Sequence, residues 1–300
     1  MTMSGPAYVA RRASRSSIHQ VRGIACHVRE WGEPGQPKLF LLHGWMDVSA
    51  SFQFLVDYLA GDWHVLAPDW RGFGLSGRAP AGYWFQDYYA DLDAILEHCS
   101  PDAPVNLVGH SMGGNVACTY AGIRPQRVRR LASLEGFGSQ RTVPAMAPER
   151  YERWLAELRV TPGQKRYTSL EAVAERLREG NPRLPADKAR FLAPHWARES
   201  EAGGFVMRFD PRHRVVNPVL NRVDELMACW RRITCPVLWV RGTESTAPHW
   251  REDTPAQLAE RKACFRDFRE LEFDRCGHMI HHDAPERLAP ALEAFIGSDT

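Results

Sequence analysis

The feature that most constrains the fold of this chain is a serine-centred turn between an apolar run and a helical stretch. Residues 109–113 (GHSMG) directly follow the apolar run 105–108 and precede a stretch at 115–123 with helical character. A sharp strand-to-helix turn needs glycine two positions before and two after the serine, because side chains there would collide where strand and helix pack closely. The pattern predicts that Ser111 stands out of the sheet on a strained backbone, as a candidate nucleophile.

The rest of the chain alternates short apolar runs with amphipathic stretches, which is typical of a mostly parallel sheet covered by helices on both faces. The predicted strands are 17–22, 24–31, 38–42, 63–68, 105–108, 129–134, 236–240 and 269–273. The predicted helices that flank them are 51–60, 83–99, 115–123, 254–264 and 284–296. Because ligands bind at the carboxyl ends of strands in such sheets, we expect the polar residues just past these ends to share one edge.

One long segment interrupts the alternation. Residues 138–232 show helical patterns without obvious strands between them, and they carry more basic than acidic side chains. The predicted helices are 148–159, 169–179, 185–198 and 222–232. We therefore predict an α/β core domain formed by 17–137 and 233–297, with 138–232 inserted as a helical lid after the sixth strand. Residues 1–16 are polar and are expected to form a flexible leader.

Composition argues against several other classes of protein. The 300 residues carry a formal net charge of +2, which does not call for a nucleic-acid or membrane partner. Seven cysteines without a C-x-x-C pair suit a reducing compartment. No apolar run resembles a signal peptide or approaches the ~20 residues that span a bilayer. We therefore expect a cytoplasmic protein that acts on a small molecule, with an oligomeric state that the sequence leaves open.

Acyl transfer by a serine requires a base, an acid that orients the base, and donors for the oxyanion. His278, on the predicted loop between the last strand and the last helix, is the candidate base. His43 and His110 fall in tight turns, where a structural hydrogen bond is the expected role. The His-His-Asp run at 281–283 is not accompanied by a second group of potential ligands at the spacing typical of metal sites. We therefore predict no metal and no organic cofactor.

Two main-chain amides are the candidate donors for the oxyanion. The Met112 amide follows the nucleophile, and the Trp45 amide follows a His-Gly pair after a predicted strand. One such preorganised donor is worth about 10²–10³ in rate. The indole of Trp45 is also a candidate pocket wall, together with His110, Trp154 and Trp196. The aromatic residues of the lid have an alternative role in its core, because they recur at helical spacing.

The motifs of this chain, in their order and separation, resemble the α/β-hydrolase fold superfamily over nearly its whole length. They are LLHGW at 41–45, DWRGFGLS at 69–76, GHSMGG at 109–114, PVL at 236–238 and GH at 277–278. HGWMD at 43–47 and the Asp-Pro-Arg at 210–212 further resemble the branch called serine hydrolase-like proteins. The resemblance implies an eight-stranded sheet with a helical cap and hydrolysis through an acyl-enzyme. It also implies that Asp69 and Arg71 brace the loop beside the nucleophile.

The acid is where this chain departs from the usual pattern of the superfamily. An aspartate usually lies three residues past the glycine that follows strand 236–240, but here Ser245 holds that position and Glu244 precedes it. Some branches, certain haloalkane dehalogenases among them, carry the acid at the end of the preceding strand, where this chain has Glu135. A carboxylate at that buried edge requires a partner such as an imidazolium. We favour Glu135 over Glu244, with a purely structural tie at the lid hinge as the alternative role for Glu135.

These residues favour a serine hydrolase that cleaves a small-to-medium carboxylic ester bearing a hydrophobic or aryl group. A serine nucleophile argues against dehalogenase and epoxide hydrolase chemistry, in which the ester forms on a carboxylate. Two alternatives stay open. One is a hydrolase of carbon–carbon bonds in aryl-diketone ring-fission products, whose acidity a basic lid would suit. The other is a binding module with little turnover, because loss of the acid alone lowers kcat by ~10⁴.

Overall fold

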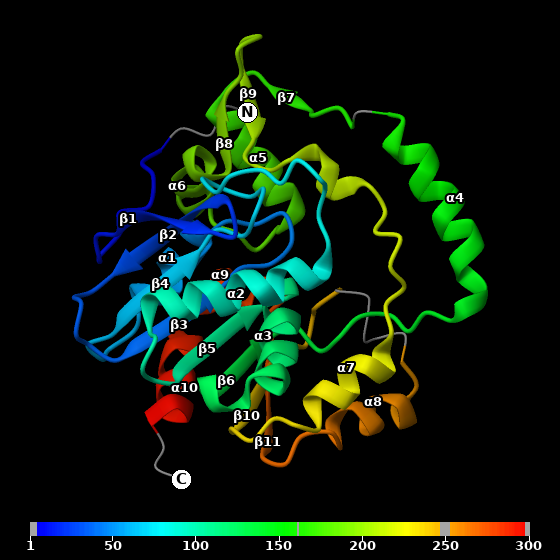
Figure 1. Cartoon of the computed structure of the whole chain (residues 1–300). Coiled ribbons are helices and arrows are strands. Elements are labelled where there is room, and N and C mark those ends of the chain that lie inside the picture. The colour runs from blue at the N-terminus through cyan, green and yellow to red at the C-terminus, as the bar shows by residue number, and fades with distance from the viewer. Residues whose placement is uncertain (1–4, 161, 247–252, 298–300) are drawn as a thin grey trace.

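The computed structural model describes residues 5–160, 162–246 and 253–297, and its centre is a single eight-stranded sheet (Figure 1). The strand order is β1-β2-β4-β3-β5-β6-β10-β11. The strands are β1 (Arg15–Val21), β2 (Ile24–Trp31), β3 (Lys38–Leu42), β4 (His64–Pro68), β5 (Val105–His110), β6 (Val128–Leu134), β10 (Val237–Gly242) and β11 (Phe268–Phe273). β2 pairs antiparallel with both β1 and β4, and all other neighbours pair parallel. The predicted fold class is therefore confirmed.

Helices cover both faces of this sheet, as the alternating pattern predicted. Their bounds are α1 (Gln53–Val56), α2 (Phe85–Cys99), α3 (Met112–Ile123), α7 (Val223–Trp230), α8 (Pro255–Lys262), α9 (Ile280–Asp283) and α10 (Pro285–Gly297). One apolar core joins α2, α3 and α7 to one face, with Leu92, Val116 and Trp230 fully buried in it. A second core joins α1, α9 and α10 to the opposite face, with Leu55 and Leu288 at its centre. The four central parallel strands are thus shielded on both sides.

The chain leaves the sheet after β6, its sixth strand, and returns to it at β10. The intervening helices are α4 (Ala147–Leu158), α5 (Leu170–Gly180), α6 (Ala186–Trp196) and α7, close to the predicted ranges. The prediction that this segment contains no strands was wrong. Three short strands, β7 (Arg166–Tyr167), β8 (Ala197–Glu199) and β9 (Phe205–Met207), pair antiparallel in the order β7-β9-β8. Strands of two or three residues are too short for a two-residue alternation to appear in the sequence.

The helices of the inserted segment differ in how they pack. α5 and α6 bury Val173 and Leu192 in a third apolar cluster that reaches Phe54 of the core. α4 has no buried residue and stands at the right of Figure 1, away from the sheet. Its outer face exposes about half of the side chains of Tyr151 and Leu155. α4 is therefore the most weakly anchored helix of the inserted segment.

Part of the segment 1–16, which was expected to form a flexible leader, instead contacts the core through Tyr8, Arg11 and Arg12, and residues 1–4 lie outside the described residues. The Tyr8 hydroxyl donates to Asp57 at 2.8 Å, and the Arg11 and Arg12 amides donate to the same carboxylate at 3.1 and 2.8 Å. The Tyr8 amide also donates to the carbonyl of Asp187 in α6 at 3.0 Å. Because one buried carboxylate satisfies three donors, this segment is held in place before β1 begins.

Candidate active site

Ser111 lies at the sharp turn between β5 and α3. Its backbone has φ 51° and ψ −114°, a conformation that non-glycine residues rarely adopt and that costs about 1–3 kcal/mol. The Ser111 amide donates to the Leu134 carbonyl at 2.8 Å. A Cβ on Gly109 would lie 2.4 Å from the Gly113 backbone, and one on Gly113 would lie 2.1 Å from the Leu42 carbonyl oxygen. The turn thus requires glycine at both positions, for the steric reason that the sequence indicated.

His278 lies on the loop after β11, and its Nδ1 is 3.2 Å from Oε2 of Glu135. Glu135 directly follows β6, and its side chain is fully buried. Its Oε1 accepts from the Gly242 amide at 2.7 Å, and its Oε2 accepts from the hydroxyl of Ser245. Ser245, the residue at the usual position of the acid, therefore donates a hydrogen bond to the candidate acid Glu135. Three donors surround Glu135 and compensate for its burial.

The structure places the other candidate acid elsewhere. The Glu244 side chain is 48% exposed and forms an ion pair with Arg183 of the inserted segment. Its amide donates to the Cys276 carbonyl at 2.9 Å, which fixes the backbone with the side chain pointing outward. Of the two candidates, only Glu135 makes a hydrogen bond to His278 within the described residues.

A cavity of about 790 Å³ brings together the predicted residues Ser111, His278, Glu135, Trp45 and Met112. The Trp45 side chain is 53% exposed and forms part of its wall. Within the described part of the chain, neither the Trp45 amide nor the Met112 amide donates to a protein acceptor. Both amides remain available to a substrate oxyanion, since Trp45 lies on the loop after β3 and Met112 is the first residue of α3.

Three residues predicted to line the substrate pocket do not line this cavity. His110 is buried, and its Nε2 donates to the carbonyl of His278 at 2.9 Å. Trp154 lies against Trp84, with ring centroids 6.3 Å apart. Trp196 lines a separate cavity of about 390 Å³ that shares the wall of Trp45, and its indole donates to Ser51 at 3.2 Å. These corrections arise because local periodicity does not fix which way a side chain turns in three dimensions.

The structure adds residues of the inserted segment that the sequence analysis did not assign to the pocket. His213 lines the cavity and stacks between the rings of Phe73 and Tyr83, at centroid distances of 3.9 and 3.6 Å. Burial lowers its pKa to about 3. Arg150 and Arg212 also line the cavity. The Asp-Pro-Arg motif just before His213 was the sequence signal that pointed to this segment.

Asp210 connects this motif to the loop after β4. Its carboxylate accepts from Arg212 at 2.6 Å and from the Tyr83 hydroxyl at 2.9 Å. Burial opposes ionisation of Asp210, but the hydrogen bonds from Arg212 and Tyr83 outweigh it and lower the pKa to about 2. A charged, well-satisfied carboxylate therefore holds the inserted segment against the core beside the cavity.

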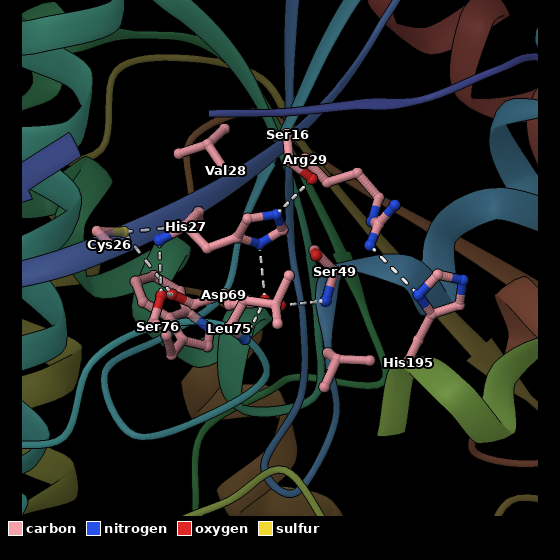
Figure 2. Close-up of polar contacts among 12 residues, drawn as sticks. Ser16, Cys26, His27, Val28, Arg29, Ser49, Asp69, Leu75, Ser76 and His195 are labelled. Atoms are coloured by element: carbon pink, nitrogen blue, oxygen red, sulfur yellow. Dashed lines mark hydrogen bonds and ion pairs between the residues drawn. The ribbon is translucent and has the colours of Figure 1, made fainter. Parts of the chain in front are cut away.

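Asp69, which the resemblance implied would brace the loop beside the nucleophile, is hydrogen-bonded to the segment that follows β3 and to its own loop after β4. It accepts from the Ser49 amide at 2.6 Å, the Leu75 amide at 2.9 Å and His27 Nδ1 at 2.8 Å (Figure 2). The other ring nitrogen of His27 lies 2.9 Å from the Ser16 hydroxyl in β1. Burial disfavours the charge, yet these hydrogen bonds dominate and hold the pKa of Asp69 far below its usual range. Asp69 thus links β1, β2 and two loops through one carboxylate.

His43 and Arg71 have structural contacts on the same side of the site. His43 Nδ1 donates to the Gly44 carbonyl at 2.7 Å, and its Nε2 accepts from the Trp70 amide at 2.9 Å. Burial lowers the pKa of His43 to about 4, so the ring stays neutral in this arrangement. Arg71 forms an ion pair with Asp91 of α2. None of these contacts leads into the cavity with Ser111.

Two further properties bear on cofactors and membranes. Within the described ranges, one group of three side chains has the composition and proximity of a metal site: Asp47, His110 and His281. It shares His281 with the His-His-Asp run at 281–283, and its other two members come from distant parts of the chain. None of the described helices combines the length and the apolar character needed to cross a bilayer.

A family model described as alpha/beta hydrolase fold matches residues 37–285, and the chain belongs to this family. It is similar to a serine hydrolase-like protein of Danio rerio, 27% identical and covering 89% of this chain and 83% of the relative. It is also similar to a 2-(acetamidomethylene)succinate hydrolase of Mesorhizobium japonicum, 26% identical, with 91% and 92% covered. Its fold is similar to a thioesterase domain from the curacin biosynthetic pathway, with a TM-score of 0.83, 24% identity and 93% and 99% covered. Together these matches support a hydrolase of the α/β fold.

Proposed function

We propose that the protein is a serine hydrolase that cleaves a small-to-medium carboxylic ester through an acyl-enzyme intermediate. The observation that carries the proposal is the cavity shared by Ser111 and His278, with His278 held 3.2 Å from a fully buried Glu135. The nucleophile, the base and the acid come from the ends of β5, β11 and β6, which meet at one edge of the sheet.

The chemistry follows from the hydrogen bond between Glu135 and Nδ1 of His278. That bond sets the tautomer and leaves Nε2 to take the proton from Ser111 as its oxygen attacks the ester carbonyl carbon. The oxyanion of the tetrahedral intermediate is stabilised by the amides of Trp45 and Met112. His278 then gives its proton to the departing alcohol, and the acyl group stays on Ser111. A water activated by the same ring attacks the acyl carbon and releases the acid.

The low-turnover alternative rested on the missing aspartate at position 245. The three hydrogen bonds of Glu135 weaken that argument, because they supply His278 with a buried, well-oriented carboxylate from the neighbouring strand. We therefore favour an active hydrolase over a binding module.

The first test is hydrolysis of p-nitrophenyl butyrate by the wild-type protein and by Ser111→Ala. We expect turnover by the wild type and a loss of at least ~10³ in kcat for the variant, since nucleophile removal abolishes the covalent route. An active-site phosphonate should label wild-type Ser111 stoichiometrically, as peptide mass mapping will show. Turnover that persists unchanged in Ser111→Ala would refute the proposal. Labelling of Ser111 without turnover of any ester would favour the carbon–carbon bond hydrolase, whereas very slow labelling would favour the binding module.

A second candidate is the hydrolysis of carbon–carbon bonds in acidic aryl-diketone ring-fission products. It is favoured by Arg150, which lines both the catalytic cavity and an adjoining cavity of about 460 Å³. Arg150 Nε donates to the Asn217 carbonyl at 2.6 Å, and no carboxylate pairs with it among the described residues. One relative is a hydrolase of a substituted succinate by its name. A substrate panel that includes both neutral esters and ring-fission products distinguishes the two activities.

A further inference from the structure

Three side chains that are distant in the sequence meet in the interior behind the catalytic loops. Asp47 lies on the loop after β3, His110 is the last residue of β5, and His281 lies in α9. All three are buried, with no more than 3% of any of them exposed. One ligand atom from each, a carboxylate oxygen or a ring nitrogen, lies within 4.8 Å of the other two.

The polar atoms that face one another in this cluster have no hydrogen-bond partner. Asp47 Oδ1 accepts from the Val48 amide at 2.8 Å and from the Ser51 hydroxyl, but its Oδ2 has no donor. Nδ1 of His110 and both ring nitrogens of His281 are likewise buried and unsatisfied. An unpartnered buried polar atom costs about 1–3 kcal/mol, so a native protein seldom leaves several together.

The hydrogen bond of His110 fixes which of its nitrogens carries a lone pair. Nε2 lies 2.9 Å from the His278 carbonyl, which only accepts, so Nε2 carries the proton. Nδ1 is then a bare acceptor, and it is buried without a hydrogen-bond partner. Metal-bound histidines usually show this arrangement, in which one nitrogen donates to a carbonyl and orients the other toward the ion.

The side chains of the cluster do not satisfy one another. Nε2 of His281 lies 4.0 Å from Oδ2 of Asp47, which is beyond hydrogen-bond distance.

We propose that Asp47, His110 and His281 bind one divalent first-row transition cation, with Zn²⁺ as the probe of choice. Two imidazoles and one carboxylate match the ligands of this class of ions, whereas Mg²⁺ and Ca²⁺ prefer oxygen ligands alone. Tetrahedral bonds of about 2.0–2.1 Å require the ligand atoms to lie about 3.3 Å apart, so the side chains move inward by about 1 Å. The fourth position is left to a water molecule.

The position of the site defines its role. Asp47 lies two residues after Trp45, His110 directly precedes Ser111, and His281 lies three residues after His278. A bound cation would therefore tie together the three loops that carry the oxyanion donor, the nucleophile and the base. It would act as a structural ion behind the site, and ester hydrolysis would not run through it.

The test measures metal binding directly, so its outcome is independent of the esterase assay. The chelator-treated full-length protein is loaded with Zn²⁺, passed through a desalting column and analysed for zinc, and Co²⁺ loading is followed by visible absorption. We expect one Zn²⁺ per chain, a tetrahedral Co²⁺ spectrum, and a rise in Tm of roughly 3–6 °C at about 100-fold excess over Kd. Asp47→Asn and His281→Gln should each reduce bound zinc at least tenfold and remove the Tm shift.

His98→Ala is the matched control. It disrupts a pair formed by His19 and the exposed His98, whose rings lie 4.4 Å apart and offer zinc a competing surface site. Its zinc content should equal that of the wild type. If His281→Gln does not fold, the isosteric Asp47→Asn still tests the proposal. In the absence of metal, Asp47→Asn should have a Tm at or above that of the wild type, so a loss of zinc binding by this variant cannot be attributed to unfolding. Wild-type protein that retains no zinc, which would leave a buried water in the cluster, would overturn the proposal. Zinc binding undiminished by Asp47→Asn would do the same.

Discussion

Glu135 is the residue whose role can be tested most sharply. We expect Glu135→Gln to lower kcat for p-nitrophenyl butyrate by about 10³–10⁴, because an amide at this position favours the wrong tautomer of His278. Glu244→Gln is the matched control, since its exposed ion pair with Arg183 is worth at most about 1 kcal/mol. The kcat of Glu244→Gln should stay within about twofold of the wild-type value. The acid assignment fails if Glu244→Gln is the variant that loses activity.

The hydroxyl of Ser245 supports the proposed role of Glu135 as the acid. It donates to the Glu135 oxygen that also meets His278, while the Gly242 amide holds the other oxygen. A second carboxylate at position 245 would meet Glu135 at this spot, and two like charges cannot both remain ionised in a buried site. A serine there keeps one charge and adds one donor.

Among the elements, the Asp-Pro-Arg segment shows how the insertion is tethered to the core. The lowered pKa of Asp210, about 2, means that its ionised form stabilises the folded state. This contribution is fully present above about pH 4 and is lost as the pH falls from 4 toward 2. We expect Asp210→Asn to lower the free energy of unfolding by about 1–2 kcal/mol at pH 7.

Urea unfolding of wild type and Asp210→Asn at pH 7, 4 and 3 checks this expectation. The difference between the two proteins should shrink as the pH falls, because protonation removes the charge of Asp210 from the wild type as well. Asp102→Asn, which alters an exposed carboxyl, serves as control and should show little difference at any pH. A stability difference that stays constant from pH 7 to 3 would contradict the tether.

The elements also show what the sequence made predictable. Strand and helix positions in the core followed from long apolar patterns, and Ser111 and Glu135 followed from their places after β5 and β6. Those inferences rest on local pattern and on the rule that parallel strands end at one edge. The strands β7, β8 and β9 were missed, because two or three residues carry no periodic signal.

The same reasoning explains which parts of the site were missed. The cluster of Asp47, His110 and His281 joins a loop, the end of a strand and a helix that are far apart in the sequence, so the chain shows no motif with metal-ligand spacing. The stacking of His213 between two rings also depends on how the insertion folds back over the core. Contacts between distant segments are decided by tertiary packing, which a single sequence does not display.

At the scale of the whole molecule, the catalytic cavity is one of three neighbouring spaces. The cavity of about 790 Å³ shares walls with cavities of about 460 and 390 Å³, the first through Arg150 and the second through Trp45. Aromatic and aliphatic side chains form much of all three linings. A substrate can therefore extend beyond the immediate surroundings of Ser111.

This arrangement predicts a preference for longer acyl groups. From p-nitrophenyl acetate to the octanoate, we expect kcat/KM to rise by at least about tenfold, since each buried methylene contributes up to about 0.8 kcal/mol. The measurement is a series of even-chain esters below their critical micelle concentrations. A steady fall in kcat/KM beyond the acetate would show that the neighbouring spaces do not receive the acyl chain.

The contact between Ser245 and Glu135 has an evolutionary consequence. Glu135 after β6 contacts His278, and Ser245 after the adjacent strand β10 contacts Glu135, so under the proposed assignment the acid can move between neighbouring strand ends without a change of scaffold. An alignment that looks for the acid only at the position of Ser245 would classify this chain as a homologue without a catalytic acid. Relatives are therefore better compared by where the carboxylate lies in the structure than by its position in the sequence.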